Sequence, residues 1–246
     1  MRKLLGFLLS PIHYLAFGLL LVIFHPIQWL SLKLGGYAAH KRSVDLLNFF
    51  VVCTYYILVC NVKFKNNQQL PIGRPIIFIA NHQSLYDIPP LIWFLRKYHA
   101  KFISKIELTK GIPSISFNLL HGGGANIDRK DRKQALAEIL KLGSRMHQHQ
   151  WSAVIFPEGT RSRTGELKPF AVGGIASLIK KAPESLIVPI AIENSWKLVR
   201  WGKFPLSVGE KLKWTVLSPI EPQGLDLEEV VAQAEMQIRS HLKATI

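Results

Sequence analysis

The chain of 246 residues carries 31 lysines and arginines against 16 aspartates and glutamates, a formal net charge of +15, and 48% of its residues are hydrophobic. This length holds one sizeable α/β domain with an appendage. The charge suits nucleic acid, an anionic membrane or anionic substrates, and the hydrophobic fraction favours the membrane. The sequence contains no nucleic-acid-binding module, zinc-ligand spacing or Walker-type loop, so nucleic acid is not an expected partner.

Residues 4–34 and 44–62 are two mainly apolar stretches. A spanning helix needs about 20 apolar residues, so the second stretch is just long enough, while Pro11 and Pro26 interrupt the first. Cations stand at every junction of these stretches: Arg2, Lys3, Lys33, Lys41, Arg42, Lys63 and Lys65. Two spanning helices would normally carry cations on one side. We therefore favour a hydrophobic two-helix membrane anchor over residues 1–65 that enters one leaflet, with two spanning helices as the alternative.

Residues 66–246 alternate between expected strands and helices, which predicts an α/β sheet flanked by helices. The expected strands cover residues 76–80, 100–104, 125–127, 152–156, 186–192 and 211–217, and the expected helices cover residues 91–98, 130–149, 173–181 and 226–243. Pro189 lies inside one expected strand. Because proline is largely confined to edge strands, we expect this strand near an edge of the sheet.

His82 and Asp87 follow the apolar strand expected at residues 76–80, a place where α/β sheets often carry their chemistry. Histidine can accept and return a proton near neutral pH. On one continuous helix the two side chains would point about 140° apart, so they meet only if the chain turns, as the two prolines at positions 89 and 90 favour. Asp87 would then orient His82 as a base. Alternatively, Asp87 only caps a helix.

The segment from Phe156 to Ser162 reads Phe-Pro-Glu-Gly-Thr-Arg-Ser. Gly159 allows a sharp turn whose amides can face an anion, and Arg161 offers a planar fork suited to phosphate oxygens. The alternative is a solvated turn in which Glu158 and Arg161 pair with each other.

The two motifs, in this order and about seventy residues apart, resemble the glycerolipid acyltransferase superfamily, and most closely its lysophosphatidate (1-acylglycerol-3-phosphate) acyltransferases. Further blocks resemble the family at residues 105–108, 126–129 and 188–190. One departure is the glycine-rich segment at residues 121–126, where a bulkier apolar run is expected. The implied fold is a glycerolipid-acyltransferase-type α/β sheet, with the acyltransferase domain at residues 66–246.

The resemblance implies an enzyme that moves a fatty acyl group from acyl-CoA or acyl-carrier protein to the sn-2 hydroxyl of lysophosphatidic acid, giving phosphatidic acid in phospholipid biosynthesis. His82 is the implied general base and Asp87 its orienting partner. The implied substrate-binding residues are Asn81, Lys105, Arg129, Glu158, Gly159, Thr160 and Arg161. No metal and no cofactor are implied. The other implied partner is an anionic phospholipid membrane, the cytoplasmic one, with the active site on its cytosolic face.

Three alternatives remain. The acceptor can be glycerol-3-phosphate or another lysolipid. The chain can be a non-catalytic lipid-binding protein on the same fold, although intact His82, Asp87 and Arg161 argue against this. The reaction can also pass through an acyl-enzyme on Ser84, which the absence of a Gly-x-Ser-x-Gly elbow disfavours.

Overall fold

The structure, a computed structural model, describes residues 2–244. At its centre lies a seven-stranded sheet of the described chain in the order β1-β7-β6-β2-β5-β3-β4. The strands are β1 (Asn61–Lys65), β2 (Ile76–Ala80), β3 (Lys101–Lys105), β4 (Ala125–Ile127), β5 (Ala153–Ile155), β6 (Leu186–Glu193) and β7 (Lys211–Val216). From β6 to β4 all neighbours are parallel, and β7 runs antiparallel to β6. The carboxyl ends of these five parallel strands therefore lie along one edge.

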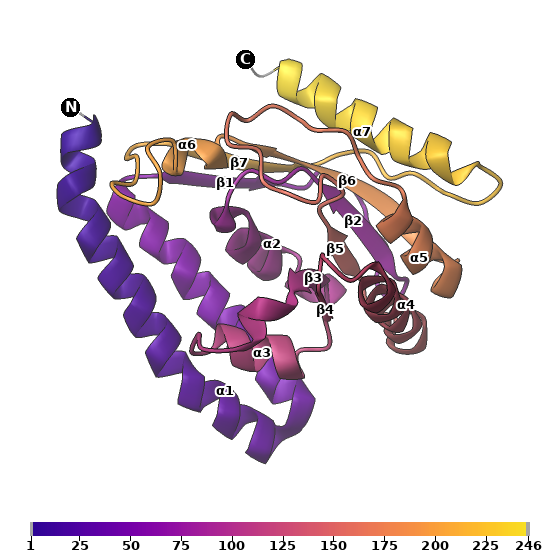
Figure 1. Ribbon diagram of the computed structural model, residues 1–246, viewed down its shortest axis with the longest axis horizontal. Helices are drawn as coiled ribbons and strands as arrows, with labels where there is room; N and C mark the ends of the chain where they lie inside the picture. Colours follow the sequence, from indigo (N-terminus) through magenta and orange to yellow (C-terminus); the bar gives the residue numbers. More distant parts are fainter. Residues whose placement is uncertain (1, 245–246) are drawn as a thin grey trace.

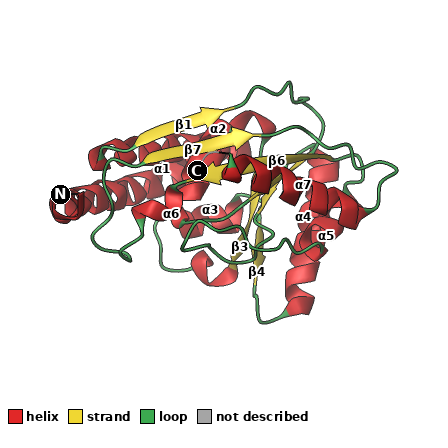
Figure 2. Ribbon diagram, turned by 90° about the horizontal axis from the view of Figure 1, so that it is seen from above, coloured by secondary structure: helices red, strands yellow, loops and turns green. Residues whose placement is uncertain are grey.

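Helices cover both faces of the sheet (Figures 1 and 2). They are α1 (Arg2–Thr54), α2 (Ile88–Phe94), α3 (Ile115–His121), α4 (Arg132–His149), α5 (Gly173–Lys181), α6 (Ser195–Leu198) and α7 (Leu227–Lys243), with 3₁₀ turns at Tyr55–Leu58, Leu85–Asp87, Arg96–Tyr98 and Ile106–Thr109. The helical periodicity of residues 130–149 is confirmed by α4, which buries Ile139, Leu142 and Met146. Its first turn is capped by the Asp131 carboxylate, which accepts from two backbone amides.

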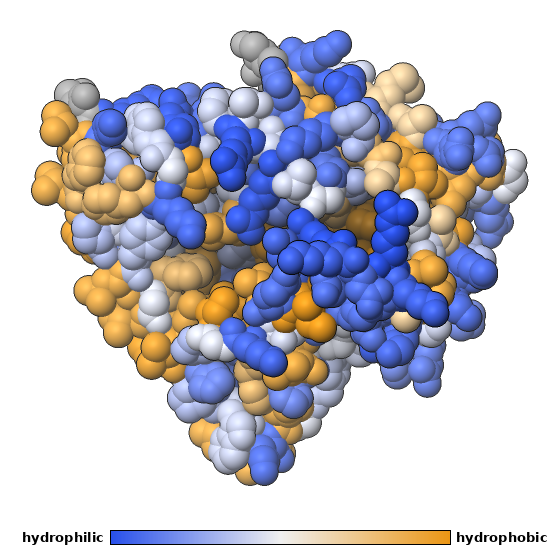
Figure 3. All heavy atoms as spheres, viewed as in Figure 1, coloured by the Kyte–Doolittle hydropathy of each residue, from blue (hydrophilic) through white to orange (hydrophobic). Residues whose placement is uncertain are grey.

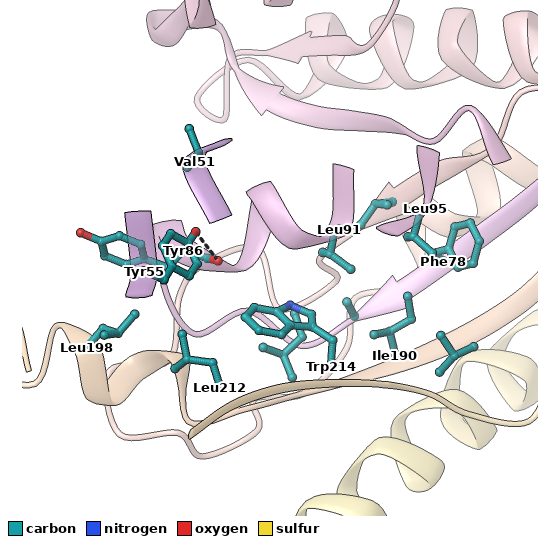
Figure 4. Close-up of a cluster of buried hydrophobic side chains, with 14 of the residues drawn as sticks. Val51, Tyr55, Phe78, Tyr86, Leu91, Leu95, Ile190, Leu198, Leu212 and Trp214 are labelled. Carbon is teal, nitrogen blue, oxygen red and sulfur yellow. Dashed lines mark hydrogen bonds between the residues drawn. The ribbon is translucent and has the colours of Figure 1, made fainter. Parts of the chain in front are cut away.

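Two apolar cores lie on opposite faces of the sheet because successive side chains of a strand alternate. In β2, Phe78 joins the core beneath α1 and α2, while Ile77 and Ile79 join the core beneath α4, α5 and α7. Figure 4 shows the first core, where Trp214 of β7 packs between the sheet and α2. Burial on both faces explains why all five residues of β2 are apolar and buried.

Helix α1 changes direction at Gly36, whose φ of 65° is a left-handed value that glycine adopts without penalty. It therefore has two arms, which we call arm 1 (residues 2–35) and arm 2 (residues 37–54), lying side by side (Figure 1). His13 Nδ1 is 3.1 Å from the Thr54 carbonyl oxygen, and the Phe24 and Phe50 rings are 6.0 Å apart. Arm 1 continues through Pro11 and Pro26 rather than ending there.

Among the described residues, one helix is long and apolar enough to cross a membrane, and it is α1 with the turn that follows it. Most of its apolar window is not buried within the protein. The exposed side chains of arm 1 include Leu4, Leu8, Leu15 and Leu19. Their spacing places them along one side of the helix, opposite the residues that pack on the protein.

Two expectations for this part of the chain are wrong in detail. The second apolar stretch is not one helix, since arm 2 ends at Thr54 and residues 61–65 form β1, which pairs with β7. The sheet therefore begins before residue 66.

The strand containing Pro189 is not near an edge, because β6 lies between β2 and β7. The Pro189 carbonyl accepts from the Leu217 amide, which lies just beyond the last residue of β7. Because the N–H and C=O of a strand residue point the same way, the N–H that Pro189 lacks would face this end of the β6–β7 ladder, where its loss is tolerated.

Candidate active site

Four neighbouring parallel strands bring the predicted site residues to one edge of the sheet. His82 follows β2, the Phe156–Ser162 segment follows β5, Lys105 ends β3 and Arg129 follows β4. These strands are adjacent in the order β2-β5-β3-β4. The two motifs therefore meet in space because β2 and β5 pair directly.

His82 and Asp87 are in contact, as the motif predicts. His82 Nδ1 lies 2.8 Å from Asp87 Oδ2, and the aspartate is fully buried. The chain makes the required turn through the 3₁₀ turn Leu85–Asp87, before the two prolines start α2. A carboxylate accepts the Nδ1 proton, so the tautomer leaves Nε2 unprotonated. Nε2 is then the atom that can take a proton from a substrate.

The Asp87 carboxylate is held by several donors besides His82. Its Oδ2 accepts from the backbone amides of Gln83 at 2.6 Å and Ser84 at 2.9 Å, and its Oδ1 accepts from the Ser195 hydroxyl. Such bonds fix the orientation of a buried carboxylate. Asp87 also completes a capping box with Ser84, the N-cap of the 3₁₀ turn, whereas its side chain makes no capping bond to α2, the helix that the alternative interpretation expected it to cap.

Ser84 serves this local structure. Its side chain is buried, its oxygen accepts from the Tyr86 amide at 3.1 Å, and its hydroxyl lies 3.5 Å from Asp87 Oδ1. It is the N-cap of the 3₁₀ turn. These contacts give the hydroxyl a structural role.

The second motif wraps around His82. Glu158 Oε1 accepts from the His82 amide at 2.6 Å, and its Oε2 accepts from the Lys168 amide at 3.0 Å. The Ser162 amide donates to the His82 carbonyl at 2.7 Å. Burial raises the pKa of Glu158, and these two amide bonds act in the opposite sense. Glu158 therefore holds the two motifs together and does not pair with Arg161 in any contact that the structure records.

The His82 ring is also fixed from one side. It stacks on Phe156, with ring centroids 4.1 Å apart and planes inclined by 17°. On its other nitrogen, Arg161 Nε lies 3.4 Å from Nε2, a long contact. Arg161 thus occupies the place beside Nε2.

Arg161 is the cation nearest to His82 among the predicted site residues. Much of the Arg161 residue is open to solvent, but partial desolvation still lowers the pKa of its guanidinium. The Asp87 carboxylate raises this pKa, and the positive charge of Arg129 lowers it. The guanidinium stays charged at any working pH. The influence of Arg129 means that the cations after β4 and β5 share one region.

The remaining predicted residues differ in what they touch. Gly159 has a φ of 66°, as the expected sharp turn requires, and its amide donates to the Phe156 carbonyl. Thr160, Lys105 and Arg129 are exposed. Asn81 is buried, and its side-chain amide exchanges two hydrogen bonds with the backbone of Ile192, at 2.9 and 2.7 Å. Its polar atoms thus join β2 to β6 rather than face a substrate.

A cavity of about 580 Å³ extends from this site, between the two arms of α1 on one side and α2, α3 and β3 on the other. Arg161, which contacts His82, and Lys203 both line it and are exposed. Between this Arg161 end and the polar end at β3, the cavity walls are largely apolar. The apolar wall residues from α1 and α2 include Phe17, Leu21, Val44, Leu47, Val51, Ile88 and Ile92. The shape and lining suit a hydrocarbon chain.

The other end of the cavity is polar and lies at the amino end of β3. Lys101 is buried there and donates to the Tyr37 hydroxyl, and Lys41 Nζ is 2.6 Å from Asp45 Oδ2. Burial, with Lys41 as the next cause, lowers the pKa of Lys101 to about 7. The glycine-rich segment that departs from the family pattern lies nearby, and Gly122 and Gly124 line the cavity. A Cβ at Gly124 would come within 2.7 Å of the Phe102 carbonyl oxygen, so glycine is required there.

Several residues of the site are missing from the sequence-based prediction. Ser195 contacts Asp87, Phe156 stacks on His82, and Gln83 Oε1 lies 3.4 Å from both the Ser195 hydroxyl and the Trp196 amide. Phe156 and Gln83 lie inside the two motifs and could have been found there. Ser195 carries no local signal. In residues 2–244, no group of three or more metal-binding side chains lies together.

Comparison with known proteins gives a consistent family. A family model described as Acyltransferase matches residues 61–193, just over half of the chain. The chain is 28% identical over 163 residues to human 1-acyl-sn-glycerol-3-phosphate acyltransferase beta, covering 66% of this chain and 56% of that one. It is 32% identical over 150 residues to the Helicobacter pylori 1-acyl-sn-glycerol-3-phosphate acyltransferase, covering 59% and 60%. The matches thus span less than two thirds of these relatives.

The fold is also found in a solved structure. The crystal structure of the 1-acyl-sn-glycerophosphate acyltransferase from Thermotoga maritima superposes with a TM-score of 0.81, at 23% identity, over all of this chain and 98% of the other. The expected α/β sheet flanked by helices is therefore confirmed. From the family model, and with the motif contacts described above, the chain belongs to the Acyltransferase family.

Proposed function

We propose that this protein transfers a fatty acyl group from an acyl thioester to the sn-2 hydroxyl of lysophosphatidic acid, giving phosphatidic acid. The observation that carries the proposal is the His82–Asp87 contact of 2.8 Å, with Nε2 facing Arg161 beside a cavity suited to an acyl chain. Relatives named for this activity in human and Helicobacter pylori support the choice of acceptor.

In the proposed reaction, His82 Nε2 takes the proton of the acceptor hydroxyl as its oxygen attacks the thioester carbonyl carbon. The carbon–sulfur bond then breaks, and the leaving thiolate takes the proton back from the imidazolium. Asp87 holds Nδ1 and stabilises the imidazolium between these steps. The products are an ester and a free thiol, and the enzyme returns to its starting state without a covalent intermediate.

Arg161 is proposed to hold the acceptor phosphate, with Lys105 and Arg129 supplying further positive charge from the neighbouring strands. Moving the guanidinium to the phosphate frees Nε2 for the hydroxyl, so binding and activation are coupled. The apolar part of the cavity is proposed to hold the acyl chain of the donor. Both possible carriers, CoA and acyl-carrier protein, present the same thioester to the site.

The membrane attachment is proposed to be a one-leaflet hairpin. Arm 1 is tied to loops of the catalytic domain at widely separated points: Ser10 Oγ accepts from the Leu206 amide at 2.8 Å, and the Leu21 carbonyl accepts from the Ser114 hydroxyl at 2.6 Å. If arm 1 crossed the bilayer, these loops would enter the hydrocarbon with it, where exposed loop backbone is not tolerated. We place the active site on the cytosolic face of the cytoplasmic membrane, where soluble thioester donors are available.

The test is a purified-protein assay of thiol release from acyl-CoA and from acyl-carrier protein, with a panel of acceptors that includes lysophosphatidic acid, glycerol-3-phosphate and other lysolipids. The proposal expects release that depends on lysophosphatidic acid and produces phosphatidic acid. Release with glycerol-3-phosphate alone would identify the other acceptor, and no acceptor-dependent release would favour a non-catalytic lipid-binding protein.

A further inference from the structure

The loop between α6 and β7, residues 199–210, is fastened to the first turns of arm 1. The Tyr14 hydroxyl donates to the Lys203 carbonyl, and the Phe7 and Phe204 rings meet edge to face with centroids 5.4 Å apart. Gly6 allows the closest approach, since a Cβ there would come within 2.3 Å of the Leu206 carbonyl oxygen. The loop and the start of arm 1 therefore form one surface.

This surface is apolar where it faces outward. Phe204 is 50% exposed although Pro205 and Leu206, which follow it, are buried. On arm 1, Leu4 is 71% exposed and Leu8 69%. In Figure 3 hydrophobic residues gather along α1 on this side of the molecule. Large exposed side chains gathered in this way mark a contact surface.

Cations and tryptophan border the apolar side chains. Lys3 Nζ lies 6.0 Å from the Trp201 ring centroid, and the Arg200 guanidinium carbon lies 5.7 Å from the same ring. Lys203 is exposed in the same loop. An apolar centre with aromatic and cationic neighbours is the composition found at the boundary between acyl chains and anionic headgroups.

The same loop borders the cavity described above. Lys203 from the loop, Phe17 from arm 1 and Arg161 from the second motif all line it. Lys203 and Arg161 are exposed, whereas Gln28 and Lys101, which line the cavity elsewhere, are buried. One solvent-exposed part of the cavity lining is thus next to the apolar surface of the loop.

We infer that Trp201 to Phe204 and the first turns of arm 1 form a lip that lies at the boundary between the acyl chains and the headgroups of an anionic phospholipid bilayer, and that the lipid acceptor enters the site across this lip. The inference rests on the proposed function for the identity of the acceptor. A bilayer is the occupant because the apolar surface continues along the exposed side of arm 1 for about 45 Å, at 1.5 Å per residue, and its borders are positively charged. A lipid crossing the lip would meet Lys203 first and Arg161 next.

The test compares full-length wild type with Phe204→Ser, Phe204→Leu and the control Leu136→Ser. Leu136 is also 50% exposed, but it lies on α4, away from the lip. Two quantities are measured: partitioning to equimolar phosphatidylcholine and phosphatidylglycerol vesicles, and acylation of lysophosphatidic acid either embedded in those vesicles or supplied as a short-chain, water-soluble form. Circular dichroism and thermal unfolding verify that each variant is folded.

Phe204→Ser is expected to weaken vesicle partitioning and acylation of embedded acceptor about tenfold each, while acylation of the soluble acceptor stays within about twofold of wild type by the same argument. Phe204→Leu keeps an apolar side chain and is expected to retain most of the vesicle partitioning and most of the acylation of embedded acceptor. Leu136→Ser is expected to match wild type in all three measurements. If Phe204→Ser partitions to vesicles as Leu136→Ser does, or loses soluble and embedded activity equally, the lip is refuted. A wild type that binds vesicles through Phe204 but acylates no lysophosphatidic acid would refute the proposed function and leave the lip as a lipid contact.

Discussion

The hydroxyl of Ser195 donates a hydrogen bond to Oδ1 of Asp87, across a separation of 108 residues. Both side chains are fully buried. Ser195 opens α6 directly after β6, and Asp87 follows β2, the strand that pairs with β6. The bond leaves Oδ2 of the same carboxylate turned to His82. In the proposed mechanism Ser195 is therefore a positioning residue for His82, and it acts through Asp87.

Replacing Ser195 by alanine is expected to lower kcat about tenfold, because a hydrogen bond to a charged group contributes about 1.5–3 kcal/mol and part of this holds the carboxylate in place. KM for the acceptor should change little, since Ser195 touches no substrate. Ser185→Ala is the matched control, because Ser185 is equally buried and its hydroxyl has no hydrogen-bond partner in the structure. Equal kinetics for the two variants would assign Ser195 to packing alone.

His82→Ala is expected to lower turnover by roughly 100- to 10,000-fold, the usual contribution of a general base. Vesicle binding and the thermal unfolding temperature should stay close to wild type, because His82 lies at the site and not at the membrane surface. Steady-state thiol release measures turnover, sedimentation with vesicles measures vesicle binding, and a thermal melt measures the unfolding temperature. A His82→Ala variant with turnover near wild type would remove the histidine from the reaction.

Ser84→Ala is expected to keep most of the activity but to lower the free energy of unfolding by about 1 kcal/mol, as the loss of an N-cap does. Chemical denaturation and steady-state kinetics measure the two effects. The rival acyl-enzyme mechanism expects the reverse, an inactive variant together with a labelled acyl-protein in the wild type. Mass spectrometry of wild type mixed with donor alone separates the two mechanisms.

Arg161→Ala is expected to cost roughly 2–4 kcal/mol of acceptor binding in the transition state, a loss of roughly 30- to 1,000-fold in kcat/KM for phosphate-bearing acceptors. Arg161→Lys should recover little, because an ammonium does not reproduce the planar fork. Hydrolysis of the donor by water should stay nearly unchanged. Arg163, exposed in the same loop, is the control for general positive charge. Equal losses for Arg161→Ala and Arg163→Ala, both abolished by salt, would contradict a phosphate clamp.

The pH dependence of stability is expected to depend on Lys101. Its pKa of about 7 in the folded protein lies below the usual value of 10.5, so the unfolded chain binds more protons between these values. The free energy of unfolding therefore rises with pH in this range. Below pH 7, Lys101 is charged in the folded protein as well, and the buried charge destabilises the fold to its full extent. Between pH 7 and about 9, the free energy of unfolding of the wild type should rise by about 2 kcal/mol more than that of Lys101→Met. Denaturant titrations at several pH values test this, and parallel curves would contradict a depressed lysine.

Much of the site was predictable because its central contact is local. His82 and Asp87 lie five residues apart, and the turn between them is made by the capping residue Ser84 and the two prolines that start α2. The continuous apolar run of β2 and the helical spacing of apolar residues in α4 likewise predicted these two elements from their own segments. The left-handed turn at Gly159 also follows from its own loop, whereas Glu158 binds the His82 amide, 76 residues away.

Only the tertiary structure decided the contacts between distant strands. Asn81 binds the backbone of Ile192, 111 residues away, and Ser195 reaches Asp87, because β6 pairs with β2. The interior place of Pro189 follows from that same strand order. Strand order depends on how crossover connections pack over the whole sheet, and no short segment carries that information. The cavity likewise exists because α1 reverses at Gly36 and lies over α2, so its apolar walls and its polar end come from segments that are separate in the sequence.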